Sequence, residues 1–351
     1  MAPERRRAVF VDLLRLVASF QMIQGHTLDA LLEDRLRHGL VFAVWSYTRG
    51  LTSVAFLFAA GLSFHLATLR NLEAHRANAA AVRHRVKRGL WLILLGYLMH
   101  LPIGTRSWAE ALRVGGIVDI LQCIGFTLLL LEGLSLILRD ARQVAWAAAT
   151  LGLLSFALWP LTEPLGATSG LLSNWVSHAS GSIFPILPWS GHMLMGTALA
   201  QLALPRGAAT PALRTSLVLA TAGALFLLVG LAGHQLDSPA LARSTNLGLV
   251  ALVSAGLVAV SARVARLPRR LEILAGETLS LYVFHVLLLY GSFIGLGALI
   301  GHRLDLPQGL LAVAALSLLS VGVALGWHRL KAQRRARAEP RPEPAPIRIL
   351  P

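Results

Sequence analysis

Long apolar segments separated by short polar ones recur along this chain and predict a bundle of membrane-spanning helices. A helix needs about 20 predominantly apolar residues to cross the hydrocarbon core of a bilayer. Pro185 and Pro188 open one of these segments and predict that a helix begins or breaks there. We therefore expect an all-α fold with about ten transmembrane helices, at 9–31, 43–69, 84–103, 114–138, 143–160, 182–203, 212–233, 245–262, 273–300 and 307–328.

The composition also indicates a membrane protein. Of the 351 residues, 55% are hydrophobic and only 14% are charged, whereas soluble domains carry about 25% charged residues. The first apolar segment is too long for the core of a cleavable signal and is interrupted by Asp12 and Arg15, so we expect no cleaved leader. The lone Cys123 excludes an intrachain disulfide framework and a thiolate metal cluster.

The formal net charge of +15 is explained by the distribution of basic residues. With a cytoplasmic N-terminus, 24 of the 32 Lys and Arg residues fall in inner segments, seven fall in outer loops, and Arg15 lies within a span. This bias predicts that both termini are cytoplasmic. The charge then serves topology and attraction to anionic lipid, and we expect no nucleic-acid partner.

The domain organisation is expected to be simple. We predict one integral membrane domain over 1–330, because no segment has the composition of a separate soluble domain. Residues 331–351 are basic and Pro-rich, which predicts a disordered cytoplasmic tail. The longest stretch between spans, 161–181, lies on the predicted outer side and fits a short re-entrant or lid segment.

Arg15 and His26 in the first span are the strongest functional signal. Ionisable side chains at bilayer depth are costly and indicate function by default. The two residues are eleven positions apart, so they share a helix face at a separation of about 16 Å. Asp12 precedes Arg15 by three residues and is its natural counter-ion.

This arrangement fits a donor that carries phosphates at one end and reacts at the other. An arginine in the inner half of the span can hold phosphate oxygens, and a histidine further out can act as a general base. Coenzyme A thioesters have such a shape. Motifs of phosphate-binding loops, zinc proteases and nucleophilic serine hydrolases are missing from the sequence, which disfavours those classes.

Other polar residues in predicted spans have simpler explanations. Asp119 and Gln122, at i and i+3, fit hydrogen bonds between helices, as do His65 and His285. Trp45 and Trp189 fit anchors at the membrane interface, and Arg49 and Arg113 fit side chains that extend to the outer surface. Glu277 lies eight residues before His285, on roughly the same face.

Several segments resemble known membrane acyltransferases. The opening RRRAVFVDLLRLVASFQMIQGH resembles their first span, and the spacing of Arg15 and His26 is similar to the Arg-x10-His motif of the acyltransferase-3 family of glycan O-acylases. The remaining chain is more similar to heparan-α-glucosaminide N-acetyltransferase and its bacterial relatives. This likeness rests on WSYTRGLTSVAFLFAAGLSF at 45–64, GGIVDILQCIGF at 115–126, FPILPWSGHMLMG at 184–196 and GETLSLYVFHVLLLYG at 276–291.

The resemblance implies transfer of an acetyl or other short acyl group from cytoplasmic acyl-CoA to a sugar amine or hydroxyl across the membrane, without a metal. His26 matches the motif histidine and would be the base, and Arg15 would orient the donor with Asp12. Leu16 replaces the glycine usual after that arginine. In the animal enzymes the active histidine lies in the first luminal loop, where His38 is the counterpart by spacing, so the base is His26 or His38.

The expected partners and location follow from the same likeness. The partners are the bilayer, acyl-CoA and a sugar or glycan acceptor, in a bacterial cytoplasmic membrane, and a homodimer is compatible with the sequence. We expect Arg49, Asn174 and His192 to guide the acceptor. The supporting polar residues would be Asp119, Gln122, Glu277 and His285.

Two alternatives to a transferase stay open at this point. A transporter or flippase would commonly show broken helices in both halves of the chain, but only one Pro-broken opening is present, at 185–188. A scaffold that has lost activity is compatible with the change at Leu16. The transfer itself would proceed either directly or through an acyl-histidine.

Overall fold

A computed structural model describes residues 9–101, 107–108, 114–167, 171–204, 212–264, 266–291 and 295–338. Within these ranges the regular elements are all helices, which confirms the predicted all-α class. In chain order they are α1 (Val9–Leu31), η1 (Asp34–Leu36), α2 (Gly39–Ala67), η2 (Leu69–Asn71), α3 (Leu72–Ala77), α4 (Ala79–Met99), α6 (Ile120–Ile137), α7 (Ala141–Thr162), η3 (Glu163–Ala167), α8 (Leu171–Val176), α9 (Ile186–Ala203), α10 (Ala212–Gln235), α11 (Pro239–Ala242), α12 (Ser244–Ser261), α13 (Arg269–Gly276), α14 (Thr278–Tyr290), α15 (Leu296–Leu299) and α16 (Leu306–Ala338).

The described helices make the chain an integral membrane protein. Six of them are long and apolar enough to cross a membrane, and a seventh span results if α13 and α14, which meet at a 67° bend, count as one. Helices also lie at the other predicted spans, but α1 and α4 carry several charged residues, and α9 is less apolar because it contains Ser190, His192 and Gln201. The predicted number of about ten spans is therefore not confirmed.

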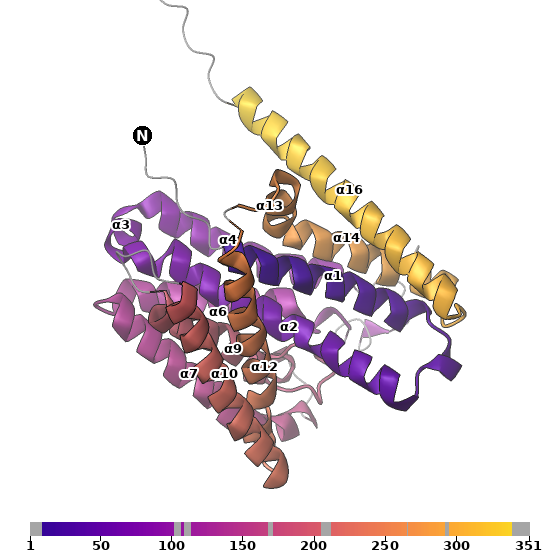
Figure 1. Cartoon of the computed structure of the whole chain (residues 1–351), viewed down its shortest axis with the longest axis horizontal. Helices are drawn as coiled ribbons and strands as arrows, with labels where there is room; N and C mark the ends of the chain where they lie inside the picture. Colours follow the sequence, from indigo (N-terminus) through magenta and orange to yellow (C-terminus); the bar gives the residue numbers. More distant parts are fainter. Residues whose placement is uncertain are drawn as a thin grey trace, which may run out of the picture.

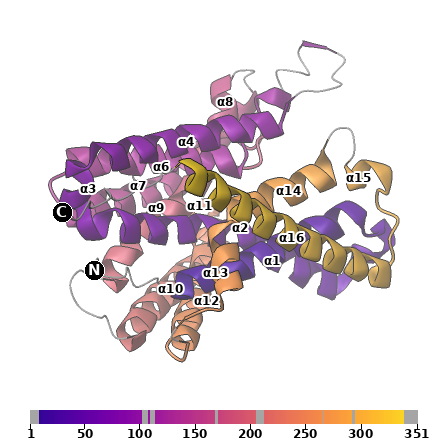
Figure 2. The same cartoon turned by 90° about the horizontal axis from the view of Figure 1, so that it is seen from above.

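The helices form groups that meet around α2 (Figures 1 and 2). The pair α10 and α12 lies on one side, and α4, α6, α7 and α9 lie on another. The third group contains α1, α14 and α16, with α16 running along the outside of α14. Because α2 packs against both α1 and α9, it connects the groups that enclose the site described below.

Glycines allow α2 and α9 to pack at very short range. A Cβ atom on Gly61 would lie 2.1 Å from the carbonyl oxygen of Met193, and one on Gly196 would lie 2.5 Å from that of Phe58. Small residues at helix crossings bring backbones together and increase van der Waals contact. Phe58 is fully buried beside this crossing, so α2 and α9 form a tightly packed support.

Asp119 and Gln122 start helix α6. The Asp119 side chain accepts a hydrogen bond from the backbone N–H of Ile120 at 2.7 Å, and Gln122 Oε1 accepts one from the backbone N–H of Asp119 at 3.1 Å. This is a capping box, which satisfies backbone donors at a helix N-terminus. The i, i+3 spacing that predicted bonds between helices is thus local for Gln122, because the helix starts at Ile120 and not at 114.

The C-terminal helices differ from the expected ninth and tenth spans. The predicted span 273–300 is bent where Glu277 follows α13. The Glu277 carboxylate contacts α16, at 2.6 Å from Lys331 Nζ and 3.1 Å from His328 Nδ1. Helix α16 continues to Ala338, so residues 331–338 of the predicted disordered tail are helical, and 339–351 lie outside the described residues.

Candidate active site

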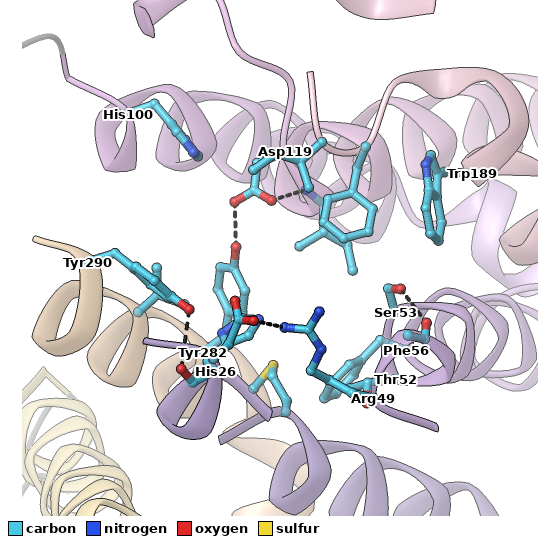
Figure 3. A pocket seen from close by; sticks show the side chains of 17 residues that line it. His26, Arg49, Thr52, Ser53, Phe56, His100, Asp119, Trp189, Tyr282 and Tyr290 are labelled. Atoms are coloured by element: carbon cyan, nitrogen blue, oxygen red, sulfur yellow. Dashed lines mark hydrogen bonds and ion pairs between the residues drawn. The ribbon is translucent and has the colours of Figure 1, made fainter. Parts of the chain in front are cut away.

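A cavity of about 650 Å³ lies between α1, α2, α14 and the starts of α6 and α9. Figure 3 shows the side chains that surround it. Helices α1, α2 and α14 supply most of its polar groups. The residue that follows α4 and the loop before α9 complete its wall. The lining includes Met22, His26, Asp29, Arg49, Thr52, Ser53, Phe56, His100, Asp119, Ile120, Phe184, Trp189, Tyr282 and Tyr290.

His26 and His285 are in direct contact at one side of this cavity. Nδ1 of His285 lies 2.6 Å from the carbonyl oxygen of Leu281. Since a carbonyl only accepts hydrogen bonds, this nitrogen carries the proton and Nε2 of His285 is an acceptor. That Nε2 lies 3.0 Å from Nδ1 of His26. The hydrogen-bond pattern therefore assigns the donor role to His26 Nδ1 and leaves a lone pair on His26 Nε2.

The lone pair of His26 is suited to proton transfer. Among the described residues, His26 Nε2 has no hydrogen-bond partner. The two imidazole rings are stacked with centroids 5.1 Å apart, which restricts rotation of the His26 ring. Tyr290 adds a hydrogen bond from its hydroxyl to the backbone carbonyl of His26 at 3.2 Å. His26 is thus held in one tautomer and one orientation inside the cavity.

Asp29 and Arg49 form an ion pair across α1 and α2. Arg49 Nη1 lies 2.7 Å from Asp29 Oδ1, and the guanidinium also lies 5.5 Å from the ring centre of Trp45. The stem of Arg49 passes against Gly25, where a Cβ atom would lie 2.6 Å from Arg49 Cγ. A larger residue at position 25 would displace this guanidinium, which Figure 3 shows extending into the cavity.

A second, smaller cavity of about 120 Å³ adjoins the first. Arg15 and Arg88 supply its cationic groups, and Arg15 Nη2 donates a hydrogen bond to Ser63 Oγ at 2.7 Å. The two cavities share a wall made of Met22, Phe56, Ile120 and Tyr282. The hydroxyl of Tyr282 in this wall donates a hydrogen bond to Asp119 Oδ2. The cavities therefore lie one after the other along the same face of α1.

Comparison with known proteins identifies the family. The family described as heparan-alpha-glucosaminide N-acetyltransferase, catalytic, matches residues 7–236, which is more than half of the chain. This chain belongs to that family. No curated protein matches the sequence. Membership of this N-acetyltransferase family makes the chain a membrane acyltransferase-type protein and indicates an enzyme.

The family match and the cavity overlap only in part. His26, Arg49, Asp119 and Trp189 lie within the matched range, whereas α14, which carries His285, begins at Thr278 beyond it. His285, which orients His26, thus lies in a part of the chain outside the N-acetyltransferase match. The likeness of Arg15 and His26 to the acyltransferase-3 motif stays a prediction.

Not all predicted site residues lie at the cavities. His38 is exposed and precedes α2, so it lies away from both cavities. Asn174 is buried and donates to the carbonyl oxygen of Gly116 at 2.9 Å. His192 is buried against the ring of Phe156, at 5.0 Å between ring centres. Asp12 lines neither cavity. Their proposed roles at the base, acceptor and donor sites remain predictions.

Three further predicted residues have other surroundings. His65 Nε2 lies 3.2 Å from the carbonyl oxygen of Leu204, in agreement with a structural role. Glu277 contacts α16, as described above, and does not share the surroundings of His285. Arg113 lies outside the described residues.

Several residues of the larger cavity were not predicted from the sequence as site residues. Asp29 follows His26 by three positions, and Tyr282 precedes His285 by three, so each shares a helix face with a histidine; Tyr290 follows His285 by five positions and does not. That spacing was available, but aromatic residues at membrane depth are common packing groups and give a weak signal. Among the described residues, His, Cys, Asp and Glu side chains form no group of three or more that could hold a metal ion.

Proposed function

We propose that this protein transfers an acetyl or other short acyl group from acyl-CoA to an amine or hydroxyl of a sugar. The observation that carries the proposal is the hydrogen-bond chain from the Leu281 carbonyl through His285 to His26. It leaves a lone pair on His26 Nε2 within a cavity of about 650 Å³. A histidine oriented by a second group is the arrangement that general-base catalysis requires.

The proposed reaction is a direct transfer. His26 Nε2 takes the proton of the acceptor hydroxyl or neutral amine as the acceptor oxygen or nitrogen bonds to the thioester carbonyl carbon. The carbon–sulfur bond then breaks, and His26 Nε2 gives its proton to the departing sulfur, so that CoA leaves as the thiol and His26 regains its lone pair. Nε2 of His285 accepts a hydrogen bond from Nδ1–H of His26 throughout. This bond stabilises the positive charge that forms on His26.

The smaller cavity is the proposed donor side. Arg15 and Arg88 present guanidinium groups, which bind phosphate oxygens through paired hydrogen bonds. A volume of about 120 Å³ holds only a segment of the thin arm of coenzyme A, so the nucleotide would stay outside this cavity, at the basic start of α4. With a cytoplasmic N-terminus, this side faces the cytoplasm and the acceptor approaches from outside.

The proposed acceptor side is the larger cavity. Its polar lining includes the Asp29–Arg49 pair and the hydroxyls of Thr52 and Ser53. These groups offer both donors and acceptors of hydrogen bonds to a sugar, while Phe56 and Trp189 offer apolar surface. A sugar with a reactive amine or hydroxyl beside His26 satisfies both kinds of surface.

The test is CoA release by the purified protein from radiolabelled acetyl-CoA with a panel of amino sugars and polyols. We expect His26→Ala to lower kcat by about 10²–10⁴-fold, and His285→Ala to lower it by about 10–100-fold through loss of orientation. His234→Ala alters an exposed histidine at the far end of α10 and serves as the matched control. Unchanged turnover in the His26 variant would overturn the assignment, and loss in a His38→Ala variant alone would move the base to His38.

Two further readouts separate competing mechanisms. Mass spectrometry after a single exposure to donor alone should show no acyl adduct, because direct transfer requires both substrates together. A stable acyl-histidine would instead establish the two-step route, with ping-pong kinetics. Solute movement across vesicles without CoA release would overturn the transferase proposal in favour of a transporter.

A further inference from the structure

Trp189 forms part of the cavity wall opposite the helix that carries His26. It lies near the start of α9 and is half-buried. Figure 3 shows its indole among the side chains that surround the cavity. Phe184 packs edge-on against it, with ring centres 4.7 Å apart. The indole thus has protein support on one side and the cavity beside it.

A chain of hydrogen bonds fixes the orientation of this indole. Trp189 Nε1 donates to His178 Nε2 at 2.9 Å, and His178 Nδ1 lies 2.6 Å from Glu163 Oε1. Because the indole nitrogen only donates, His178 Nε2 must accept, and His178 Nδ1 therefore carries the proton toward the carboxylate. The three residues come from η3, the loop after α8, and α9.

Glu163 is in turn held by donors from α7 and from residues 177–179. Its Oε2 accepts hydrogen bonds from Ser177 Oγ at 3.0 Å and from the backbone N–H of Ala179 at 3.1 Å, and its Oε1 accepts one from Trp159 Nε1. A carboxylate with several donors is a strong anchor, because hydrogen bonds to an ionised group are stronger than neutral ones. These donors thereby help to set the position of a cavity side chain.

We propose that Trp189 is the platform on which the sugar ring of the acceptor stacks, and that Glu163 and His178 are positioning residues that hold the platform in place. This inference rests on the transferase proposal above and assigns the recognition of its sugar ring to Trp189. An indole offers a large rigid apolar face to the C–H face of a pyranose, while the hydroxyls of the sugar bind polar groups elsewhere in the cavity.

The hydrogen-bonding of Trp189 argues against a simple interfacial anchor. An anchoring tryptophan directs its N–H to the water and headgroups of the interface, whereas this N–H is directed to a histidine that a carboxylate orients. Trp146 provides the contrast, since it is 68% exposed on α7. It is the matched tryptophan control in the experiments that follow.

The first experiment measures binding without turnover. Equilibrium binding of a radiolabelled amino sugar is measured in the His26→Ala background, with and without Trp189→Leu. We expect a Kd for the sugar at least about tenfold higher with Trp189→Leu, which is about 1.4 kcal/mol, and an unchanged Kd with Trp146→Leu. Equal sugar affinity with and without Trp189→Leu, or no sugar binding to any variant, would overturn the inference.

The second experiment measures specificity in the active enzyme. Trp189→Leu should raise the KM for the sugar and leave the KM for acetyl-CoA and the rate with a small acyclic amine unchanged, while Trp189→Phe, which keeps an aromatic face, should recover most of the sugar KM. Glu163→Gln should raise the sugar KM less than Trp189→Leu. A rise in the KM for acetyl-CoA as large as that for the sugar, together with a lower rate with the amine, would show a structural role and contradict the platform.

The two proposals fail in different ways. If His26-dependent CoA release is present and the sugar-to-amine preference is the same in wild type and Trp189→Leu, only the platform is wrong. If the sugar binds and stacks on Trp189 but no CoA is released, only the transferase chemistry is wrong. The thermal midpoint of each variant in detergent verifies that the variant is folded. If Trp189→Leu does not fold, Trp189→Phe is used for the same measurements.

Discussion

At the scale of single residues, Asp119 connects the end of a helix to the candidate active site. Its Oδ1 accepts from the backbone N–H of Ile120 and caps α6, whereas its Oδ2 accepts from the hydroxyl of Tyr282. Tyr282 precedes His285 by three residues on α14, so it lies on nearly the same face. One carboxylate therefore both starts α6 and contacts the helix that orients His26.

This double contact predicts a specific pattern for variants at Asp119. Asp119→Ala should lower the free energy of unfolding by about 1 kcal/mol through loss of the cap, and should also lower kcat because Tyr282 loses its acceptor. Asp119→Asn retains an acceptor oxygen and should recover most of both. Thermal unfolding in detergent and CoA release measure the two effects.

Asp140 supplies the matched control for this prediction. It caps α7 through bonds of 2.8 and 2.9 Å to the backbone N–H groups of Arg142 and Gln143 and lines neither cavity. Asp140→Ala should therefore lower the free energy of unfolding by a similar amount and leave turnover unchanged. Equal turnover in the two alanine variants would show that the contact with Tyr282 has no part in catalysis.

At the scale of helices, the crossing of α2 and α9 fixes the distance between two walls of the cavity. Arg49, Thr52 and Phe56 line it from α2, and Trp189 lines it from α9. The glycines at 61 and 196 lie further along the same two helices and bring them into backbone contact. Any side chain added at the crossing separates the helices and alters the cavity walls that they carry.

A Gly61→Ala variant tests this packing. Its Cβ atom would lie 2.1 Å from the Met193 carbonyl oxygen, so the backbone must move, and we expect a destabilisation of about 1–3 kcal/mol. Gly133→Ala on α6 is the control because its Cβ atom meets nothing within 4 Å, and higher helix propensity should stabilise it by up to about 1 kcal/mol. Equal unfolding free energies for the two variants, measured in detergent, would refute the packing argument.

At the scale of the whole molecule, two adjoining cavities form the proposed route from one membrane face to the other. Arg15 and Arg88 lie at one end, His26 and Arg49 lie in the other cavity, and four shared side chains separate them. In the proposed transfer, this separation would keep the water on the donor and acceptor sides apart. The proposal requires the arginine end to face the cytoplasm.

Cysteine labelling tests that orientation. The native Cys123 is fully buried, so a membrane-impermeant maleimide should not label the wild-type chain. A His38→Cys variant, altered at an exposed site before α2, should be labelled in intact cells. An Arg83→Cys variant, exposed on α4, should be labelled only after permeabilisation. The reverse pattern would invert the donor and acceptor sides.

Fewer of the described helices are apolar enough to cross a membrane than the sequence predicted. Segment 9–31 and residues 84–99 of the predicted span 84–103 are helical, but they contain Asp12, Arg15, Arg85 and Arg88. Arg15 and Arg88 line the smaller cavity, so charged groups near a proposed site lower the mean hydropathy of the helices that carry them. A count of apolar helices therefore omits those that supply polar site residues.

The positions of most helices and the faces of α1 follow from local sequence and could be predicted from it. Apolar runs predict the helices, Pro185 marks the start of α9, and the spacing of Arg15, Met22 and His26 places them on one face of α1. A helix face depends only on residues within the helix and its 3.6-residue period, and the family likeness rests on short contiguous segments. Even the capping box at Asp119 was present as Asp-x-x-Gln.

Only the tertiary structure decided which side chains meet. His26 and His285 are separated by 259 positions, and Tyr282 reaches Asp119 across 163. Glu277 and His285 were predicted to share a face, but the bend before α14 directs Glu277 to α16 and leaves His285 beside His26. These pairs depend on where the helices cross and at which register, and a periodic pattern specifies the face of a helix but not the partner that covers it.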